Sequence, residues 1–252
     1  MFCPRCKKEN MYSREMCSTC GAPIKPLPVP LGGKIRLGKY YWYILDKQAE
    51  RVLVISEKIL ERRPYHSQEC DITWEKCDLR RYLNSDFYNS FDEDERTRIL
   101  GTVNENSDNP WFGTDGGNPT TDKIFLLSIR EVLKYFGNSG WIQFREVHTN
   151  CDWCKDEYWP WFADQYNINR RAIDNDGVVR HWALRTPGAN MHNVTFVMGF
   201  CGDEFDHGGI NMVGSDTLID GHFVFDKSNF LAMDTTDGQF LLGVRPALWI
   251  RI

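Results

Sequence analysis

The stretch running from Tyr40-Tyr-Trp-Tyr-Ile44 to Arg51-Val-Leu-Val-Ile55 holds two runs of aromatic and β-branched residues around the polar segment Asp46-Lys-Gln-Ala-Glu50. Such residues favour strands, and two strand-like runs joined by a short polar segment favour an antiparallel hairpin. A third apolar run, Ala247-Leu-Trp-Ile-Arg-Ile252, closes the chain. We therefore expect the central sheet of the main domain to be assembled from both ends of that domain.

Helix signals lie between these strands. Cys77–Asn84 carries apolar residues at three- and four-residue spacing, and Phe91–Leu100 begins acidic and ends basic, as a helix dipole prefers. Ser128-Ile-Arg-Glu131 is a capping box that opens a short helix ending at Gly137-Asn138. From Asp174 onward, turn-forming Gly and Asp-Gly pairs recur between short apolar runs, which is typical of strands and long loops. The predicted fold class is α+β.

Four cysteines near the N-terminus have the spacing of a zinc ribbon. They occur as Cys3-Pro-Arg-Cys6 and, after ten intervening residues, as Cys17-Ser-Thr-Cys20, with Gly21 free to turn behind the second pair. Four thiolates form a closed tetrahedral site with no position open for water or substrate, so we expect one structural zinc ion. A segment this small cannot fold on apolar burial alone, and the metal would supply its folding free energy.

A disulfide-linked knuckle is the alternative for these cysteines. It requires an oxidising compartment, whereas the chain begins at Met1-Phe2-Cys3 without a signal peptide. Apolar runs such as Ile124–Leu127 and Phe240–Leu242 are far shorter than the ~20 residues of a membrane span. We therefore expect a cytoplasmic protein that keeps its thiols reduced and does not insert into a membrane.

The composition predicts one large domain behind the ribbon. With 252 residues, 42% of them hydrophobic, the chain can bury one substantial core. We divide it into a zinc ribbon at residues 1–24, a linker rich in Pro and Gly at residues 25–33, and the main domain at residues 34–252.

The net charge of −5 argues against broad nucleic-acid binding by the whole chain. The ribbon is locally basic through Arg5, Lys7, Lys8 and Arg14, so a nucleic-acid role stays open only for that module. The sequence indicates no oligomeric state.

A second group of metal-ligand residue types lies in the middle of the chain. His148-Thr-Asn-Cys151-Asp-Trp-Cys154 has the spacing of a metal-binding segment, so His148, Cys151 and Cys154 are candidate ligands. The fourth ligand would come from elsewhere in the chain: Cys70, Cys77, Cys201 or His181. The alternative is that these cysteines are small buried side chains, because several tryptophans crowd the same segment.

Two acidic segments, Asp174-Asn-Asp176-Gly177 and Asp203-Glu-Phe-Asp206, offer the oxygen ligands that calcium prefers. Neither continues into a complete EF-hand loop. Asx turns explain the same residues without a metal. Calcium therefore stays an open alternative beside the expected zinc.

The segment from Ala189 to Phe225 mixes polar and aromatic residues in a way that suits adaptable contacts with a ligand. The candidate surface residues are Asn190, His192, Asn193, Phe200, Asp203, Phe205, His207, Asn211, Asp216 and His222. An ordinary solvated loop is the alternative. Outside this segment, Trp182, Arg185 and Arg245 are expected to be core anchors, with a buried acidic partner such as Asp122. The alternative is that these three residues line a binding face.

Four ordered motifs resemble a family of uncharacterised bacterial domains whose members often carry an N-terminal zinc ribbon. The motifs are Thr73-Trp-Glu-Lys-Cys-Asp-Leu-Arg-Arg-Tyr-Leu-Asn84, Gly113-Thr-Asp-Gly-Gly-Asn-Pro-Thr-Thr-Asp-Lys-Ile-Phe-Leu-Leu-Ser128, Trp182-Ala-Leu-Arg-Thr-Pro-Gly188 and Gly243-Val-Arg-Pro-Ala-Leu-Trp249. The resemblance spans residues 33–252. The closing Gly-Val-Arg-Pro-Ala also resembles the Gly-Phe-Arg ending of C-type-lectin-fold proteins. These include formylglycine-generating-enzyme-like domains and the variable proteins diversified by retroelements.

The resemblance implies a C-type-lectin-like domain in which the first and last strands pair, helices pack on one side, and a loop-rich segment carries the ligand surface. Formylglycine-generating enzymes need a reactive cysteine pair near the C-terminal motif, and this chain has only Cys201 there. No nucleophile elbow, phosphate-binding loop or His-Glu-x-x-His helix appears in the sequence.

We therefore expect a non-catalytic protein that binds a protein partner through its C-terminal loops. A cytosolic chain without a calcium-sugar motif favours a protein ligand over a glycan. The alternatives are a thiol-dependent enzyme that uses Cys151, Cys154 or Cys201, and a retroelement-diversified variable protein.

Overall fold

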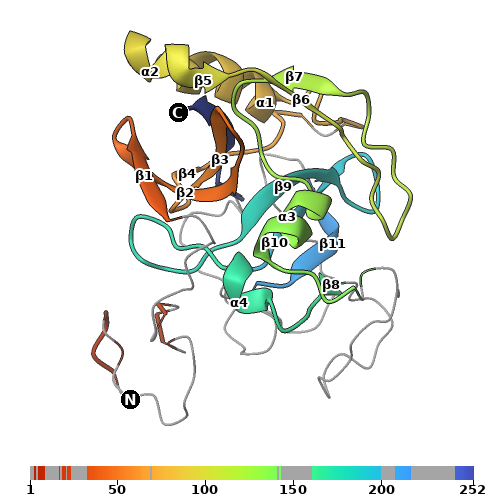
Figure 1. Cartoon of the computed structure of the whole chain (residues 1–252). Coiled ribbons are helices and arrows are strands. Elements are labelled where there is room, and N and C mark those ends of the chain that lie inside the picture. Colours follow the sequence, from red (N-terminus) through yellow and green to blue (C-terminus); the bar gives the residue numbers. More distant parts are fainter. Residues whose placement is uncertain are drawn as a thin grey trace, which may run out of the picture.

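Two main β-sheets and a few short helices form the part of the chain that follows the linker (Figure 1). The computed structural model describes residues 3, 5–8, 17, 19–20, 22–23, 33–68, 70–140, 142, 161–199, 208–216 and 242–252. Its mixed sheets and short helices place the fold among α+β or mostly β architectures, in keeping with the predicted class.

The first sheet has five strands in the order β1-β2-β3-β13-β5. These strands are β1 (Lys34–Leu37), β2 (Tyr40–Lys47), β3 (Arg51–Ser56), β13 (Ala247–Arg251) and β5 (Ile99–Leu100). Strands β2 and β3 form the predicted antiparallel hairpin, with Tyr43 opposite Ile55 and a bulge between Ile44 and Asp46. The hairpin prediction is therefore confirmed.

The C-terminal strand β13 lies next to β3, with Trp249 opposite Leu53. The expectation that the first and last strands pair is wrong in detail, because β3 separates β13 from the aromatic strand β2, and β1 lies at the sheet edge. Burial explains this order. Residues 52 to 55 of β3 are all buried and need cover on both sides, whereas β2 places Tyr41 in solvent and Trp42 in the core.

The second sheet has six strands in the order β4-β12-β9-β10-β11-β8. These strands are β4 (Glu61–Arg62), β12 (Gly243–Val244), β9 (Trp182–Pro187), β10 (Asn193–Val197), β11 (Ile210–Asp216) and β8 (Trp161–Phe162). A separate two-stranded ladder joins β6 (Thr102–Asn104) to β7 (Thr120–Asp122). Strands β9, β10 and β11 follow one another in antiparallel pairs, which confirms the strands expected after Asp174.

The chain crosses directly from the second sheet to the first between β12 and β13. Gly243 lies opposite Trp182 in the second sheet, and the chain enters β13 after only two further residues, Arg245 and Pro246. A Cβ atom at Gly243 would lie 2.6 Å from the carbonyl oxygen of His181, so this close approach requires glycine. One continuous hydrophobic core therefore extends from one sheet to the other.

Short helices lie beside both sheets (Figure 1). They are α1 (Asp78–Tyr82), the π-helical turn η1 (Leu83–Phe87), α2 (Glu93–Arg98), α3 (Ile129–Phe136) and α4 (Asn167–Arg170). Of these, α1, η1 and α2 lie near the first sheet, and α3 and α4 lie near the second. Phe87 and Phe91 pack against the aromatic strand, with ring centres 5.9 Å from Tyr40 and 6.4 Å from Trp42 respectively. The residues from the end of η1 to the start of α2 therefore cover the buried side of β2.

Helix boundaries follow local capping. The predicted capping box of Ser128 and Glu131 is present, and α3 ends at Gly137, whose φ of 112° favours glycine. The helix predicted over residues 91–100 is shorter than expected, because Ile99 takes an extended conformation and enters β5. Among the residues that the structure describes, no helix has the length and apolar character needed to cross a membrane.

Candidate functional site

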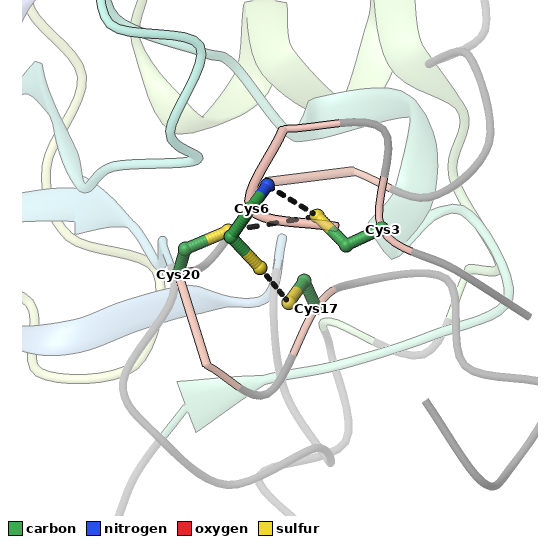
Figure 2. Close-up of side chains that lie close together, drawn as sticks. All are labelled: Cys3, Cys6, Cys17 and Cys20. Atoms are coloured by element: carbon green, nitrogen blue, oxygen red, sulfur yellow. Dashed lines mark hydrogen bonds between the residues drawn. The ribbon is translucent and has the colours of Figure 1, made fainter. Parts of the chain in front are cut away.

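The four ribbon cysteines converge on one point (Figure 2). The sulfur atoms of Cys3 and Cys20 lie 3.6 Å apart, as do those of Cys6 and Cys17, and all four lie within 4.8 Å of one another. A tetrahedral zinc site with Zn–S bonds of about 2.3 Å separates its sulfurs by about 3.8 Å, whereas a disulfide requires about 2.05 Å. The cysteines are therefore arranged as four ligands for one ion.

Backbone groups support this sulfur cage. The amide of Cys6 donates to Sγ of Cys3 at 3.5 Å, and the amide of Thr19 donates to Sγ of Cys17 at 3.4 Å. Lys7 follows the first pair with a φ of 62°, and its amide donates to the carbonyl of Cys3 at 3.0 Å. Sequence reasoning singled out only Gly21 as the turning residue, which lies outside the described residues.

The thiols of the cage do not titrate alike. Burial raises the pKa of Cys17, but hydrogen bonds from the Thr19 and Cys20 amides and from the Cys6 thiol outweigh burial and bring that pKa to about 6. Burial raises the pKa of Cys20 to about 12, and the neighbouring cysteine side chains add to the increase. Without a cation the cage therefore favours the thiolate at Cys17 and the protonated thiol at Cys20, and a bound Zn²⁺ would stabilise both as thiolates.

The predicted second metal set is not assembled by the described residues. His148, Cys151, Cys154 and Cys201 lie outside them. Cys70 is exposed. Nδ1 of His181 accepts a hydrogen bond from the amide of Gly199 at 2.9 Å. Within the described part of the chain, the ribbon cysteines form the one group of three or more His, Cys, Asp or Glu side chains with converging ligand atoms.

Cys77, another candidate for that set, is a helix cap. Its Sγ accepts from the amide of Arg80 at 3.4 Å and donates to the carbonyl of Trp74 at 3.5 Å. Burial raises the pKa of Cys77 to about 12, which keeps the thiol protonated. A protonated buried thiol is neither a good metal ligand nor a good nucleophile.

The first candidate calcium segment is a turn held by its own aspartate. Oδ1 of Asp174 accepts from the amides of Asp176 at 2.9 Å and Val178 at 3.0 Å. Its Oδ2 accepts from Nε of Arg180 at 3.0 Å. Both carboxylate oxygens thus have protein donors, which favours the Asx-turn interpretation. The second candidate segment, Asp203 to Asp206, lies outside the described residues.

The candidate residues of the predicted ligand surface do not form one patch among the described residues. Asn190, His192 and Asn193 gather at the turn between β9 and β10. Asn211 lies further along the sheet, opposite Phe196, where β11 begins. The backbone of Asp216 lies opposite Asn193, and five further candidates lie outside the described residues: Phe200, Asp203, Phe205, His207 and His222.

The β9–β10 turn is supported by segments that sequence reasoning did not include. Nδ1 of His192 lies 3.5 Å from Oδ1 of Asp71, and the amide of Ile72 donates to the carbonyl of Met191 at 3.0 Å. Oγ1 of Thr114 donates to the carbonyl of Ala189 at 2.9 Å. The signal available in the sequence was the Gly-rich motif beginning at Gly113. These contacts make the turn, residues 188–192, an ordered polar surface, here called the turn surface.

Asp122 on β7 is a buried acceptor that joins the first two motifs. Oδ1 accepts from Nε of Arg80 at 2.6 Å, and Oδ2 accepts from Nε1 of Trp74 at 3.0 Å. Nδ2 of Asn104 and Oγ1 of Thr120 also donate to Oδ2, at 2.9 and 2.7 Å. This carboxylate is fully engaged in holding α1 against β7, so its role is structural.

Trp182 and Arg185 are buried on β9, as expected of core anchors. The predicted acidic partner is wrong, because Asp122 pairs with Arg80 and Arg185 pairs instead with Glu131 of α3. The sequence pattern indicates Glu131 only as half of the capping box. Its one carboxylate therefore caps α3 and neutralises a buried guanidinium.

Arg245 lies at the joint between the sheets. Its Nε donates to the carbonyl of Ser56 at 3.1 Å, and its guanidinium lies 5.0 Å from the ring centre of Trp182 and 5.4 Å from that of Phe136. Burial lowers the pKa of Arg245 to about 10. Among the described residues no carboxylate pairs with it, so aromatic faces stabilise this cation.

One polar group resembles part of a catalytic arrangement. Nδ1 of His66 lies 2.9 Å from Oδ2 of Asp78, but the hydroxyl of Ser67 donates to the same carboxylate oxygen, at 2.5 Å. A serine nucleophile would instead donate to the imidazole. The group therefore anchors residues 66–67 to the start of α1.

Comparison with known proteins identifies the family of the main domain. A family model described as a domain of unknown function, DUF6273, matches residues 49–252. No curated protein and no solved structure matches the chain. The family match begins in the β2–β3 connection and includes all four motifs, so the predicted membership of an uncharacterised domain family is confirmed. The chain belongs to the DUF6273 family.

Proposed function

We propose that the protein is a non-catalytic interaction protein, in which a structural zinc ribbon is linked to a domain that binds a protein partner. The observation that carries the proposal is the convergence of Cys3, Cys6, Cys17 and Cys20, whose ligand atoms lie within 4.8 Å of one another. Four sulfurs complete the coordination of zinc and leave no position for a substrate, so the centre serves folding or docking.

The polar groups of the main domain support a non-catalytic role. In the part of the chain that the structure describes, Asp122, Glu131 and Asp174 are engaged by structural donors, and Cys77 is a protonated cap. The groups that resemble catalytic residues in type are thus used to hold segments together. A binding function requires no further chemistry from them.

The turn surface is the proposed place of partner binding. Asn190 is exposed, and His192 is partly exposed beside Asp71, whose side chain is 71% exposed. Mixed polar side chains on a supported turn suit adaptable hydrogen bonding with a protein. Calcium is not needed for this role.

We further propose that the main domain has a C-type-lectin-like fold and that the protein works in the reducing cytosol. The fold is supported by β13, which pairs antiparallel with a strand of the N-terminal hairpin inside the core sheet. The compartment is supported by the 3.6 Å sulfur contacts, which suit a metal rather than disulfides. An experimental structure whose strand connections differ from those of C-type lectins would contradict the fold proposal.

Metal analysis of the full chain tests the ribbon. We expect about one zinc per chain, because the four sulfurs form one site. Cys17→Ser should lose it, whereas Cys70→Ser, which removes an exposed cysteine outside the cage, should keep it. A second zinc would assign metal to the segment with His148, Cys151 and Cys154. Full zinc retention by Cys17→Ser would contradict the four-sulfur site.

The turn surface requires point substitutions. Deleting residues 189–225 would remove β10 and β11 from the second sheet and unfold the domain. The double variant Asn190→Ala/His192→Ala should fail to retain cytosolic proteins that the wild type retains, while the exposed pair Lys76→Ala/Arg130→Ala should retain them. An unchanged set of partners in the first variant would exclude the turn surface. A wild type that retains no protein would contradict the interaction role.

A further inference from the structure

The positive charge of the chain is concentrated at its N-terminal end. Residues 1–58 hold eleven Lys and Arg against five Asp and Glu, whereas residues 59–252 hold 19 against 30. The first part therefore carries an excess of six positive charges and the second an excess of 11 negative charges. The net charge of −5 hides this division, and local charge decides which ligands a surface attracts.

Within the basic part, one face of the β1–β2 ladder combines cations and tyrosines. The strand register places Lys34 opposite Tyr43 and Arg36 opposite Tyr41. Opposite residues of an antiparallel ladder share one face, so these four side chains form a two-by-two patch, here called the tyrosine-basic face. Nζ of Lys34 lies 5.0 Å from the ring centre of Tyr41, its diagonal neighbour.

The tyrosine-basic face is open to solvent. Tyr41 is 51% exposed, and among the described residues only Val103 and Ile252 are other large apolar side chains exposed to this degree. Lys34 and Arg36 are also exposed. Strand β1 is the outer strand of its sheet among the described residues (Figure 1), so this face lies at the edge of that sheet. On the opposite face of the ladder Leu37 and Trp42 are buried in the core. On the tyrosine-basic face Tyr43 packs against the core, whereas Tyr41 is exposed.

Internal contacts hold the two cations in place. Nζ of Lys34 donates to Oε1 of Glu57 at 2.9 Å, and this hydrogen bond raises the pKa of Lys34. The hydroxyl of Tyr43 donates to the same oxygen at 3.2 Å. Nε of Arg36 donates to the carbonyl of Gly38 at 3.4 Å, and no described residue accepts from its terminal nitrogens. Arg36 therefore presents a free hydrogen-bonding fork beside an exposed aromatic ring.

We propose that the tyrosine-basic face binds single-stranded nucleic acid, with Lys34 and Arg36 contacting phosphates and Tyr41 stacking on a base. Sheet surfaces bind single strands through exposed aromatic rings with cations beside them, because every base has a face for stacking. A duplex is a less suitable ligand because its base faces are stacked inside the helix. An acidic peptide would use the two cations but would leave the exposed ring of Tyr41 without a role.

Binding of the full zinc-loaded chain to a labelled oligothymidylate of about 15 nucleotides, measured by fluorescence anisotropy over a range of salt, tests the proposal. Lys34→Gln/Arg36→Gln should weaken binding about ten-fold and reduce the salt dependence by roughly 1.4 in log–log slope, since each phosphate contact contributes about 0.7. Tyr41→Ala should weaken binding at least about five-fold without changing the slope, because stacking is not ionic. Tyr41→Phe should bind like the wild type.

The matched control is Lys76→Gln/Arg130→Gln, which removes the same charge from exposed positions on other elements and should bind like the wild type. Thermal unfolding of each variant checks the fold. If the loss of the Lys34–Glu57 pair disturbs the ladder, the single variant Arg36→Gln replaces the double variant in the binding measurement. No binding by the wild type at about 50 mM salt would overturn the proposal. Wild-type affinity in Tyr41→Ala would also overturn it, as would a control variant that binds as weakly as Lys34→Gln/Arg36→Gln. If poly-glutamate competes as well as unlabelled oligothymidylate does, the face is a general polyanion surface and the proposal is wrong.

Discussion

Arg80 and Asp122, 42 residues apart in the chain, meet through a 2.6 Å contact between Nε and Oδ1. The Asp122 side chain is fully buried, while that of Arg80 is 25% exposed. A carboxylate taken out of water depends on its protein donors, and Trp74 supplies another at 3.0 Å. The pair thus fixes α1 and β7 together and links two of the four sequence motifs.

Asp122→Asn should destabilise the main domain by about 3 kcal/mol, because it leaves the Arg80 charge unpaired and turns an amide N–H₂ toward buried donors. Urea unfolding followed by tryptophan fluorescence measures the change. Asp176→Asn, at an exposed position, is the control and should change the free energy of unfolding by less than about 0.5 kcal/mol. A loss below about 1 kcal/mol for Asp122→Asn would show that the network is not important for stability.

Lys7→Gly should tighten zinc binding about five-fold. Lys7 has a φ of 62°, and relieving a left-handed conformation gains about 1 kcal/mol in the folded ribbon. Competition with a chromophoric chelator measures the affinity. Lys8→Gly removes the same charge but not this strain, so it should leave the affinity unchanged or weaker. Equal effects of the two variants would assign the gain to charge instead of conformation.

Cys70 and Cys77 should differ sharply in reactivity. Burial raises the pKa of Cys77 from 9.0 to about 12, which reduces its thiolate at neutral pH roughly a thousand-fold, whereas Cys70 is exposed. Alkylation of the native protein at pH 8 with peptide mapping should label Cys70 well before Cys77. Both should react in denaturant. Native labelling of Cys77 as fast as Cys70 would mean that α1 opens readily.

Asp164 should make the main domain sensitive to acid. Burial raises the pKa of Asp164, but its hydrogen bonds and charge contact with Arg170, 2.8 Å away, outweigh burial and lower that pKa below 3.8. The unfolded chain therefore binds this proton more readily, so the stabilisation is complete above pH 3.8 and is lost as the pH falls through the folded value.

Asp164→Asn should accordingly cost about 3 kcal/mol at neutral pH and flatten the decline in stability below pH 3.8. Chemical unfolding of residues 33–252 at a series of pH values gives both quantities without interference from zinc loss. Asp94→Asn, on exposed α2, should keep the wild-type pH profile. An unchanged profile in Asp164→Asn would place the acid-sensitive group elsewhere.

Removal of zinc should unfold the ribbon without affecting the main domain. The ribbon depends on metal for its folding, whereas the core of the main domain is formed by its own sheets and helices. Calorimetry of the full chain with and without a chelator should show the main thermal transition shifted by less than about 2 °C. A shift of more than about 8 °C would mean that the ribbon packs on the domain and stabilises it.

Local features were readable from the sequence because neighbouring residues create them. The Cys3–Cys6 and Cys17–Cys20 pairs fix their sulfurs through short knuckles, and the Ser128 capping box closes within one helical turn. The β2–β3 hairpin depends on a short connection between two strand-forming runs. In each case the interacting groups are a few residues apart, so spacing and residue type determine the geometry.

Only the tertiary structure decided which distant groups meet. Burial on both faces placed β3 between β2 and β13. Packing of the elements determined that Asp122 pairs with Arg80 and that Glu131 pairs with Arg185. The candidate ligand residues lie within one segment of the sequence, but β10 and β11 carry Asn193 and Asn211 to different points of one sheet. Pairing across such separations depends on the whole arrangement of the core, because no local spacing distinguishes one buried acid or one exposed loop from another.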